Sequence, residues 1–316
     1  MKRYYVMPKR ITSKLGVFHF LTCMYKALNG LFYSEIHFDF KNTRYIEPNM
    51  MSPIGMLFNK LKNHQNKIYL SNLNAAIKNM LLKYNFIHLS NFNNNIPQNY
   101  IKYANFNGDE VENYRKYLYE QLKDLKNIYI VSLLISNIME IFINVKMHAR
   151  NNPDKSRYGN KEVYSSGYYN KNENYVLFSI SNNGWTFADN VYKKLNINYD
   201  NSVNYIKWAL NNLNSTTDLQ RPGGIGLKKL KELIINTKGM IIICSGKGYF
   251  SLSSEKSETK IISNDLTNSF PGTSITVKIP ITDSLQNTNQ NMIKQISLKE
   301  LIMEGDKDVY NLFLKR

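Results

Sequence analysis

Two periodicities alternate along the N-terminal part of the chain. Residues 14–28, 50–62 and 73–83 carry apolar side chains at helical spacing, whereas residues 34–40 alternate apolar and polar positions, the period of a half-buried strand. Residues 67–70 form a short apolar run that is typical of another strand. Because strands and helices alternate, the chain up to residue 95 is predicted to form a small α/β domain.

An Asn-rich stretch at residues 91–107 interrupts both periods, as linkers do. Asp109 follows it as the expected N-cap of a charged helix. Residues 96–127 are therefore predicted to be a linker and a connecting helix. Helical spacing with a more apolar composition returns at residues 128–150, and a second domain is expected to extend from residue 128 to residue 281.

The first half of this second domain contains a predicted hairpin. Its two β-rich runs, residues 161–168 and 175–181, flank the polar residues 170–174. Residues 188–222 then form a helical, Asn-rich excursion that we expect to act as a lid over a ligand site.

A glycine cluster follows the excursion and leads into an amphipathic helix. Gly223, Gly224 and Gly226 precede apolar residues that recur at helical spacing from Leu227 to Ile234. The free N–H groups and the positive end of the dipole at such a helix start suit a phosphate, and a branched side chain at Gly226 would occupy that space. The spacing matches neither the Walker pattern nor the dinucleotide fingerprint.

The end of the domain is predicted to add two strands and a tail. The strands are expected at residues 240–245 and 273–279, with a turn at Gly246-Lys-Gly248 after the first. From residue 282 to residue 316 the sequence becomes polar, and we expect a C-terminal tail.

The composition places limits on partners and compartment. The net charge of +17 attracts anions, but Lys is spread evenly, so nucleic acid is an alternative partner that is not favoured. The apolar stretch at residues 15–33 is interrupted by polar side chains, which argues against a membrane span or a signal peptide. The two isolated cysteines fit a reducing compartment, and a cytoplasmic location is expected.

Polar residues line one face of the apolar helix at residues 128–150. Glu140, Asn144 and His148 are spaced four apart, so they project from the same side. Such a stripe faces water, a ligand or another polar surface, and its spacing alone does not decide which.

Four separated segments, taken together and in order, resemble motifs of the histidine-kinase-like (GHKL) ATPase superfamily, which includes gyrase, histidine kinases, heat-shock-90 chaperones and mismatch-repair ATPases. The Glu140 to His148 segment is similar to the first motif, in which Asn144 would bind Mg²⁺ and Glu140 would act as general base on water. Gly223, Gly224, Gly226 and Leu227 resemble the phosphate motif, and Ser215 and Thr216 lie where the family's lid binds phosphate.

The adenine motif departs from the family pattern. In the segment Asn182-Asn-Gly184-Trp-Thr186, Asn182 stands where the family has Asp, and Thr186 stands where it has a second glycine. A neutral acceptor binds the adenine amino group more weakly than a carboxylate, so the resemblance implies reduced ATP affinity, with Ser181 or Asn183 as alternative contacts. Pro271-Gly-Thr273 resembles the last motif, whose threonine holds adenine through a water.

The resemblance implies a two-domain α/β protein. The second domain would be a Bergerat-fold α/β sandwich with helices on one face of a mixed sheet. The first resembles a STAS-like domain, the fold of anti-sigma-factor antagonists, in which Ser52 would lie near the family's phosphorylation position. Ordinary helix-start chemistry is the alternative for Ser52.

These resemblances predict a regulatory switch that binds ATP and Mg²⁺ and hydrolyses ATP, with a protein partner or a second copy as its target. Three alternatives stay open. One is a serine/threonine kinase of the anti-sigma type acting on a STAS partner, the second is a nucleotide sensor without turnover, and the third is a basic scaffold for nucleic acid.

Overall fold

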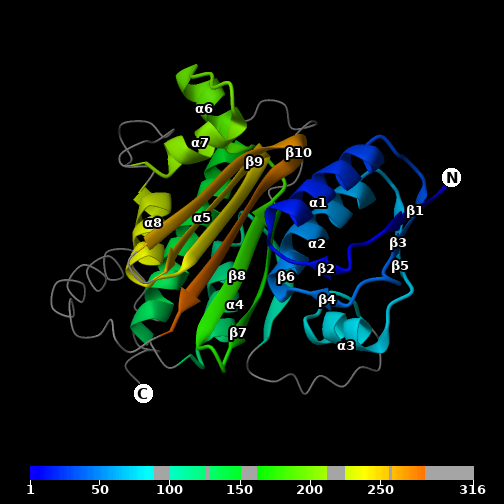
Figure 1. Ribbon diagram of the computed structural model, residues 1–316, viewed down its shortest axis with the longest axis horizontal. Helices are drawn as coiled ribbons and strands as arrows, with labels where there is room; N and C mark the ends of the chain where they lie inside the picture. The colour runs from blue at the N-terminus through cyan, green and yellow to red at the C-terminus, as the bar shows by residue number, and fades with distance from the viewer. Residues whose placement is uncertain (89–99, 126–127, 151–161, 212–224, 256–257, 282–316) are drawn as a thin grey trace.

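A computed structural model describes residues 1–88, 100–125, 128–150, 162–211, 225–255 and 258–281. It is a mixed α/β structure in which two larger sheets are separated by helices (Figure 1). Within the described ranges, no helix combines the length and the apolar character needed to span a bilayer.

The N-terminal unit has a parallel sheet of three strands in the order β1-β3-β5. β1 (Lys2–Val6), β3 (Glu35–Asp39) and β5 (Lys67–Ser71) are connected by α1 (Leu15–Leu28) and α2 (Met51–Lys62). The remaining elements are the paired short strands β2 (Arg10–Ile11) and β4 (Tyr45–Ile46), a 3₁₀ turn at Pro48–Met50, and α3 (Ala75–Lys83). The helical and strand periods predicted α1, α2, α3, β3 and β5. They did not predict β1, the short strands β2 and β4, or the 3₁₀ turn.

The second sheet has five strands in the order β6-β7-β8-β10-β9. Its members are β6 (Tyr100–Asn107), β7 (Glu162–Asn170), β8 (Tyr175–Asn182), β9 (Met240–Glu255) and β10 (Glu258–Pro280). Every pairing between these described strands is antiparallel, so the sheet is not the mixed sheet that was expected. β7 and β8 form the predicted hairpin.

Two predicted loops are strands of this sheet. Residues 100–107, expected in the linker, are β6, and α4 (Val111–Leu122) follows with Glu110 rather than Asp109 as its N-cap residue. The predicted turn at Gly246-Lys-Gly248 lies inside β9, which pairs with β10 as far as Glu255 opposite Glu258. The polar stretch between the predicted strands is therefore the arm of a long hairpin.

One face of the five-stranded sheet is covered by the helices of its own unit. α5 (Ile128–Arg150) and α8 (Ile225–Asn236) contact each other there, and α4 packs on α5. α6 (Phe187–Leu195) and α7 (Ser202–Ala209) lie at one end of the sheet (Figure 1). Asp265 of β10 accepts hydrogen bonds from the first N–H groups of α7, at Ser202 and Val203, so this part of the predicted lid is anchored to the hairpin.

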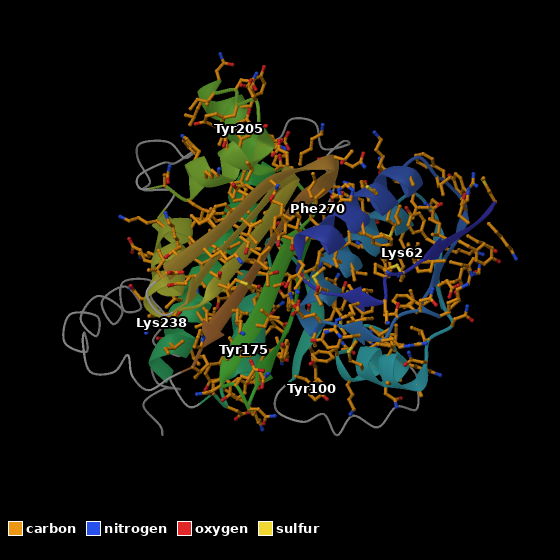
Figure 2. The ribbon with its side chains drawn as sticks, viewed as in Figure 1. Lys62, Tyr100, Tyr175, Tyr205, Lys238 and Phe270 are labelled. Atoms are coloured by element: carbon orange, nitrogen blue, oxygen red, sulfur yellow. The ribbon has the colours of Figure 1, made fainter. Side chains whose placement is uncertain are left out.

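The opposite face is covered by α1 and α2 of the N-terminal unit (Figure 1). Phe18 of α1 packs between Tyr249 of β9 and Phe270 of β10, with ring centroids 5.8 and 6.0 Å away, and Figure 2 labels Phe270 at this contact. Ile242 and Cys244 belong to the same buried cluster as the N-terminal helices. Helices therefore cover both faces, and the two units share a core.

Candidate functional site

A short polar row ends the apolar surface of the five-stranded sheet beneath its own helices. Asn182 of β8 lies opposite Thr273 of β10, which lies opposite Ser245 of β9. Residues directly opposite in a sheet share a face, and so do residues two positions apart along a strand. Two positions away, Ile180, Ile275 and Ile243 form the next row, and they belong to the core under α5 and α8. The polar row therefore faces the helix side.

Hydroxyl groups join three elements at this row. Ser245 Oγ lies 2.7 Å from Thr273 Oγ1 and accepts a 3.0 Å hydrogen bond from the N–H of Phe187, the first residue of α6. Ser245 and Thr273 are buried, whereas Asn182 is half-buried. The two hydroxyls form a fixed floor, and the Asn182 amide is the accessible member of the row.

Gly272 lets segments about 90 residues apart touch at Asn182, and Gly184 lies beside the same side chain. Gly272 has φ of +141°, and a Cβ there would overlap the carbonyl oxygen of Asn182. A Cβ at Gly184 would lie 3.2 Å from Nδ2 of Asn182. The structure thus brings the predicted motifs at Asn182, Gly184 and Thr273 together.

Thr186 is the N-cap residue of α6. Its Oγ1 accepts a hydrogen bond from the N–H of Asp189 at 3.1 Å, and the Asp189 carboxylate accepts one from the N–H of Thr186 at 2.9 Å. This reciprocal pair is a capping box. The side chain that stands where the resembled family has a glycine therefore starts a helix.

Gly226 lies directly against Glu140. A Cβ on Gly226 would lie 2.6 and 2.7 Å from Oε1 and Oε2 of Glu140, so the carboxylate occupies the space that the missing side chain leaves. Gly226 is in the first turn of α8, where the helix dipole favours negative charge. The first and third predicted motifs therefore meet at one point. Leu227, the next residue, packs against the apolar core.

The start of α8 lies at the same end of the sheet as the polar row. α8 leads through Gly239 directly into β9, beside Lys278, and Figure 2 labels Lys238 at this turn. The helix is about 18 Å long, and β9 from Met240 to Ser245 spans about 17 Å in the opposite direction. The beginning of α8 and Ser245 are therefore level with each other.

Contacts of α5 place Glu140 and Asn144 toward this end as well. Phe142 stacks on Tyr114 of α4 with centroids 4.2 Å apart, and Tyr114 Oη lies 2.8 Å from Ser165 Oγ. Ser165 pairs with Ile180, two positions before Asn182. Asn144 is half-buried and follows Glu140 by one helical turn.

Five of the predicted positions fall outside what the structure describes. Residues 212–224 contain Ser215, Thr216, Gly223 and Gly224, and the His148 side chain is also undescribed. The predicted tail, residues 282–316, lies outside it too.

The strand period excludes two alternative contacts. Ser181 and Asn183 flank Asn182 and point to the other face, toward the N-terminal unit. Ser181 Oγ lies 2.8 Å from Ser52 Oγ of α2, and Asn183 Oδ1 accepts a 2.7 Å hydrogen bond from Nζ of Lys60. Burial lowers the pKa of the Lys60 amine below its ordinary value. Neither Ser181 nor Asn183 replaces Asn182 as a contact on the helix face.

Ser52 is fully buried in a polar seam between α2 and the sheet. Its N–H donates to Ser166 Oγ at 2.9 Å, and its hydroxyl donates to the carbonyl oxygen of Tyr164 at 2.8 Å. Ser52 is the second residue of α2 and binds the sheet instead of capping its own helix. Ser52 is therefore not the cap of its helix, and its hydroxyl is buried rather than exposed.

Sequence reasoning missed Ser245 and Lys60. Ser245 ends an apolar strand beside Gly246, which was a usable signal, whereas Lys60 lies in an ordinary amphipathic helix and carries no signal of its own.

No protein-family model matches the chain, and no curated protein matches it significantly in sequence.

Proposed function

We propose that the chain is an ATP-binding switch of the histidine-kinase-like ATPase type that hydrolyses ATP. One observation carries this proposal. Four segments far apart in the sequence, at Glu140, Asn182, Gly226 and Thr273, lie at one end and on one face of the five-stranded sheet.

The donors at this end fit a purine nucleotide and Mg²⁺. The half-buried Asn182 amide offers an acceptor to the adenine amino group above a floor of two hydroxyls. Asn144 supplies the amide oxygen that a hard cation prefers, and the start of α8 supplies N–H groups for phosphate. The glycine at 226 leaves room for the Glu140 carboxylate at this helix start. There Glu140 would accept the proton of the attacking water.

Steady-state phosphate release tests the assignment. Wild type should release phosphate from Mg-ATP, Glu140→Gln should bind it with unchanged affinity but turn over about 10²- to 10⁴-fold more slowly, and Asn144→Ala should lose the dependence of binding on Mg²⁺. Equal rates in wild type and Glu140→Gln would remove the base role.

A sensor without turnover is the second candidate. The observation in its favour is Asn182, which offers a neutral acceptor where the resembled family has a carboxylate. Saturable ATP binding by wild type, without phosphate release from any variant, would select this candidate.

A further inference from the structure

The three-stranded sheet of the N-terminal unit has one face that no described element covers. α1 and α2 pack on the side of Ile36 and Phe38, which are fully buried. The alternate positions form the opposite surface, called the open face from here on. Its rows are Lys2–Glu35–Lys67, Tyr4–His37–Tyr69 and Val6–Asp39–Ser71.

A continuous stack of three rings crosses the middle of the open face. Tyr4 and His37 have ring centroids 4.7 Å apart at 19°, and His37 and Tyr69 are 4.7 Å apart at 14°. Tyr4 is 67% exposed and Tyr69 is 40% exposed. Because β1 and β5 are the edge strands, each end of the stack presents an outer ring face to solvent.

The unit that carries this stack holds most of the net charge. Residues 1–83 contain 13 Lys and Arg but three Asp and Glu, which gives +10 of the chain's +17. Lys2, Arg3 and Lys67 are exposed on β1 and β5. A polyanion is the ligand that such a unit attracts.

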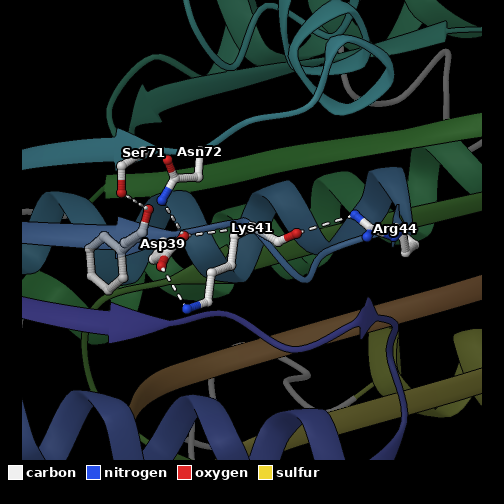
Figure 3. A network of polar contacts seen from close by, with 6 residues as sticks. Asp39, Lys41, Arg44, Ser71 and Asn72 are labelled. Carbon is white, nitrogen blue, oxygen red and sulfur yellow. Dashed lines mark hydrogen bonds and ion pairs between the residues drawn. The ribbon is translucent and has the colours of Figure 1, made fainter.

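The two carboxylates of the open face are locally neutralised. Glu35 lies 3.5 Å from Nζ of Lys2. Asp39 accepts hydrogen bonds from Asn72 Nδ2 and from the N–H of Lys41, and Nζ of Lys41 lies 4.0 Å away (Figure 3). The hydrogen bond from Asn72, then that from Lys41, lowers the pKa of the Asp39 carboxyl. Neither carboxylate is left as a bare charge facing an incoming phosphate.

The combination of exposed rings and positive charge selects the occupant. A second copy of the chain would bring another +10 against this unit, which opposes pairing through the open face. Single-stranded nucleic acid offers a phosphate backbone for the lysines and free base faces for the rings, whereas a duplex hides its bases.

We propose that the open face binds single-stranded nucleic acid, with bases stacking on the outer faces of Tyr4 and Tyr69 and the backbone held by Lys2 and Lys67. This site is separate from the nucleotide site and does not depend on it. The three rings already stack on one another in the unbound chain, which reduces the side-chain entropy lost on association.

The test is fluorescence anisotropy of a labelled 20-nucleotide single strand of mixed sequence, titrated with the full chain at about 50 mM salt without ATP. Tyr4→Ala and Tyr69→Ala should each weaken binding about 5- to 150-fold. Tyr4→Phe keeps the ring and should bind as wild type. Tyr192→Ala is the matched control, because it removes a tyrosine that is 53% exposed on α6.

Salt dependence supplies a second readout. Lys2→Gln and Lys67→Gln should each reduce the slope of log affinity against log salt by about 0.7. Undiminished binding by both alanine variants, no binding at 50 mM salt, or tighter binding to the duplex would overturn the proposal. Tyr4-dependent binding to phosphatidylserine vesicles without binding to the single strand would overturn it in favour of a lipid surface.

Discussion

The contact between Gly226 and Glu140 gives the sharpest test of the candidate site, through Gly226→Ala. The carboxyl carbon of Glu140 would lie even nearer to the new Cβ than its two oxygens, which would lie 2.6 and 2.7 Å away, so the carboxylate must retreat by about 1.1 Å to reach ordinary contact at 3.4 Å. The carboxylate is the far end of a flexible side chain, so this retreat costs the fold little. Alanine also favours a helix over glycine by up to about 1 kcal/mol.

The expected result is a folded protein with slow turnover. A displacement of about 1 Å of a catalytic group costs about 10²-fold in rate, so phosphate release should fall by about that factor while the thermal midpoint holds or rises. Gly16→Ala is the matched control. Gly16 is likewise the second residue of a helix, and a Cβ there has nothing within 4 Å.

A double-mutant cycle separates this explanation from the one that the sequence alone offered, a side chain intruding on phosphate. In the Glu140→Ala background the carboxylate is gone, so Gly226→Ala should cause no further loss of turnover or of Mg-ATP affinity. A wild-type rate in Gly226→Ala, or an additive loss in the double variant, would refute the reasoning.

Three further changes probe the residues around the site. Asn182→Asp should tighten ATP binding about 2- to 30-fold in a calorimetric titration, because a charged acceptor replaces a neutral one; no gain would mean that another group reads the base. Asn144→Ala should bind ATP equally with and without Mg²⁺, and retained Mg²⁺ dependence would exclude Asn144 as ligand. Lys60→Met tests the lowered pKa of the Lys60 amine. At pH values between its pKa in the folded chain and 10.5, the amine binds more protons in the unfolded chain, so the stability of the wild type rises with pH. When the free energy of unfolding is measured in urea from pH 7 to 10, the variant should lack that rise. If the free energies of the variant and the wild type change with pH in parallel, the prediction is contradicted.

Periodicity predicted most elements of the fold because it reports burial on one side. The helices at Leu15–Leu28, Met51–Lys62 and Ile225–Asn236 lie where their apolar stripes indicated. It failed for β6 and for the long hairpin, where polar side chains on an edge strand or an exposed arm leave no alternation to read. Of the ten positions of β10 from Glu258 to Thr267, one, Leu266, is buried.

The candidate site was predictable in its parts but not in its contacts. Motif spacing identified Glu140, Asn182, Gly226 and Thr273, and the structure places them at one end of the sheet. Spacing along a chain does not show which side chain occupies the space beside a glycine, so the packing of Glu140 against Gly226 could not be foreseen. The same limit hid the contact between Gly272 and Asn182.

The N-terminal unit covers the second face of the five-stranded sheet, and this cover connects the candidate site to the rest of the molecule. β8 alternates, so Asn182 faces the site while Ser181 and Asn183 face α2. Adjacent residues of one strand cannot move independently, because each peptide unit is planar and only two torsions separate neighbouring side chains. A shift of Asn182 on binding adenine would therefore pull on the hydrogen bonds to Ser52 and Lys60. Around Ser52 and Lys60 the contacts between α2 and the sheet are hydrogen bonds of hydroxyl, amide and amine groups, and they lie beside the apolar core that the two units share. The candidate site on one face of this sheet thus has a direct physical connection to the N-terminal unit on the other.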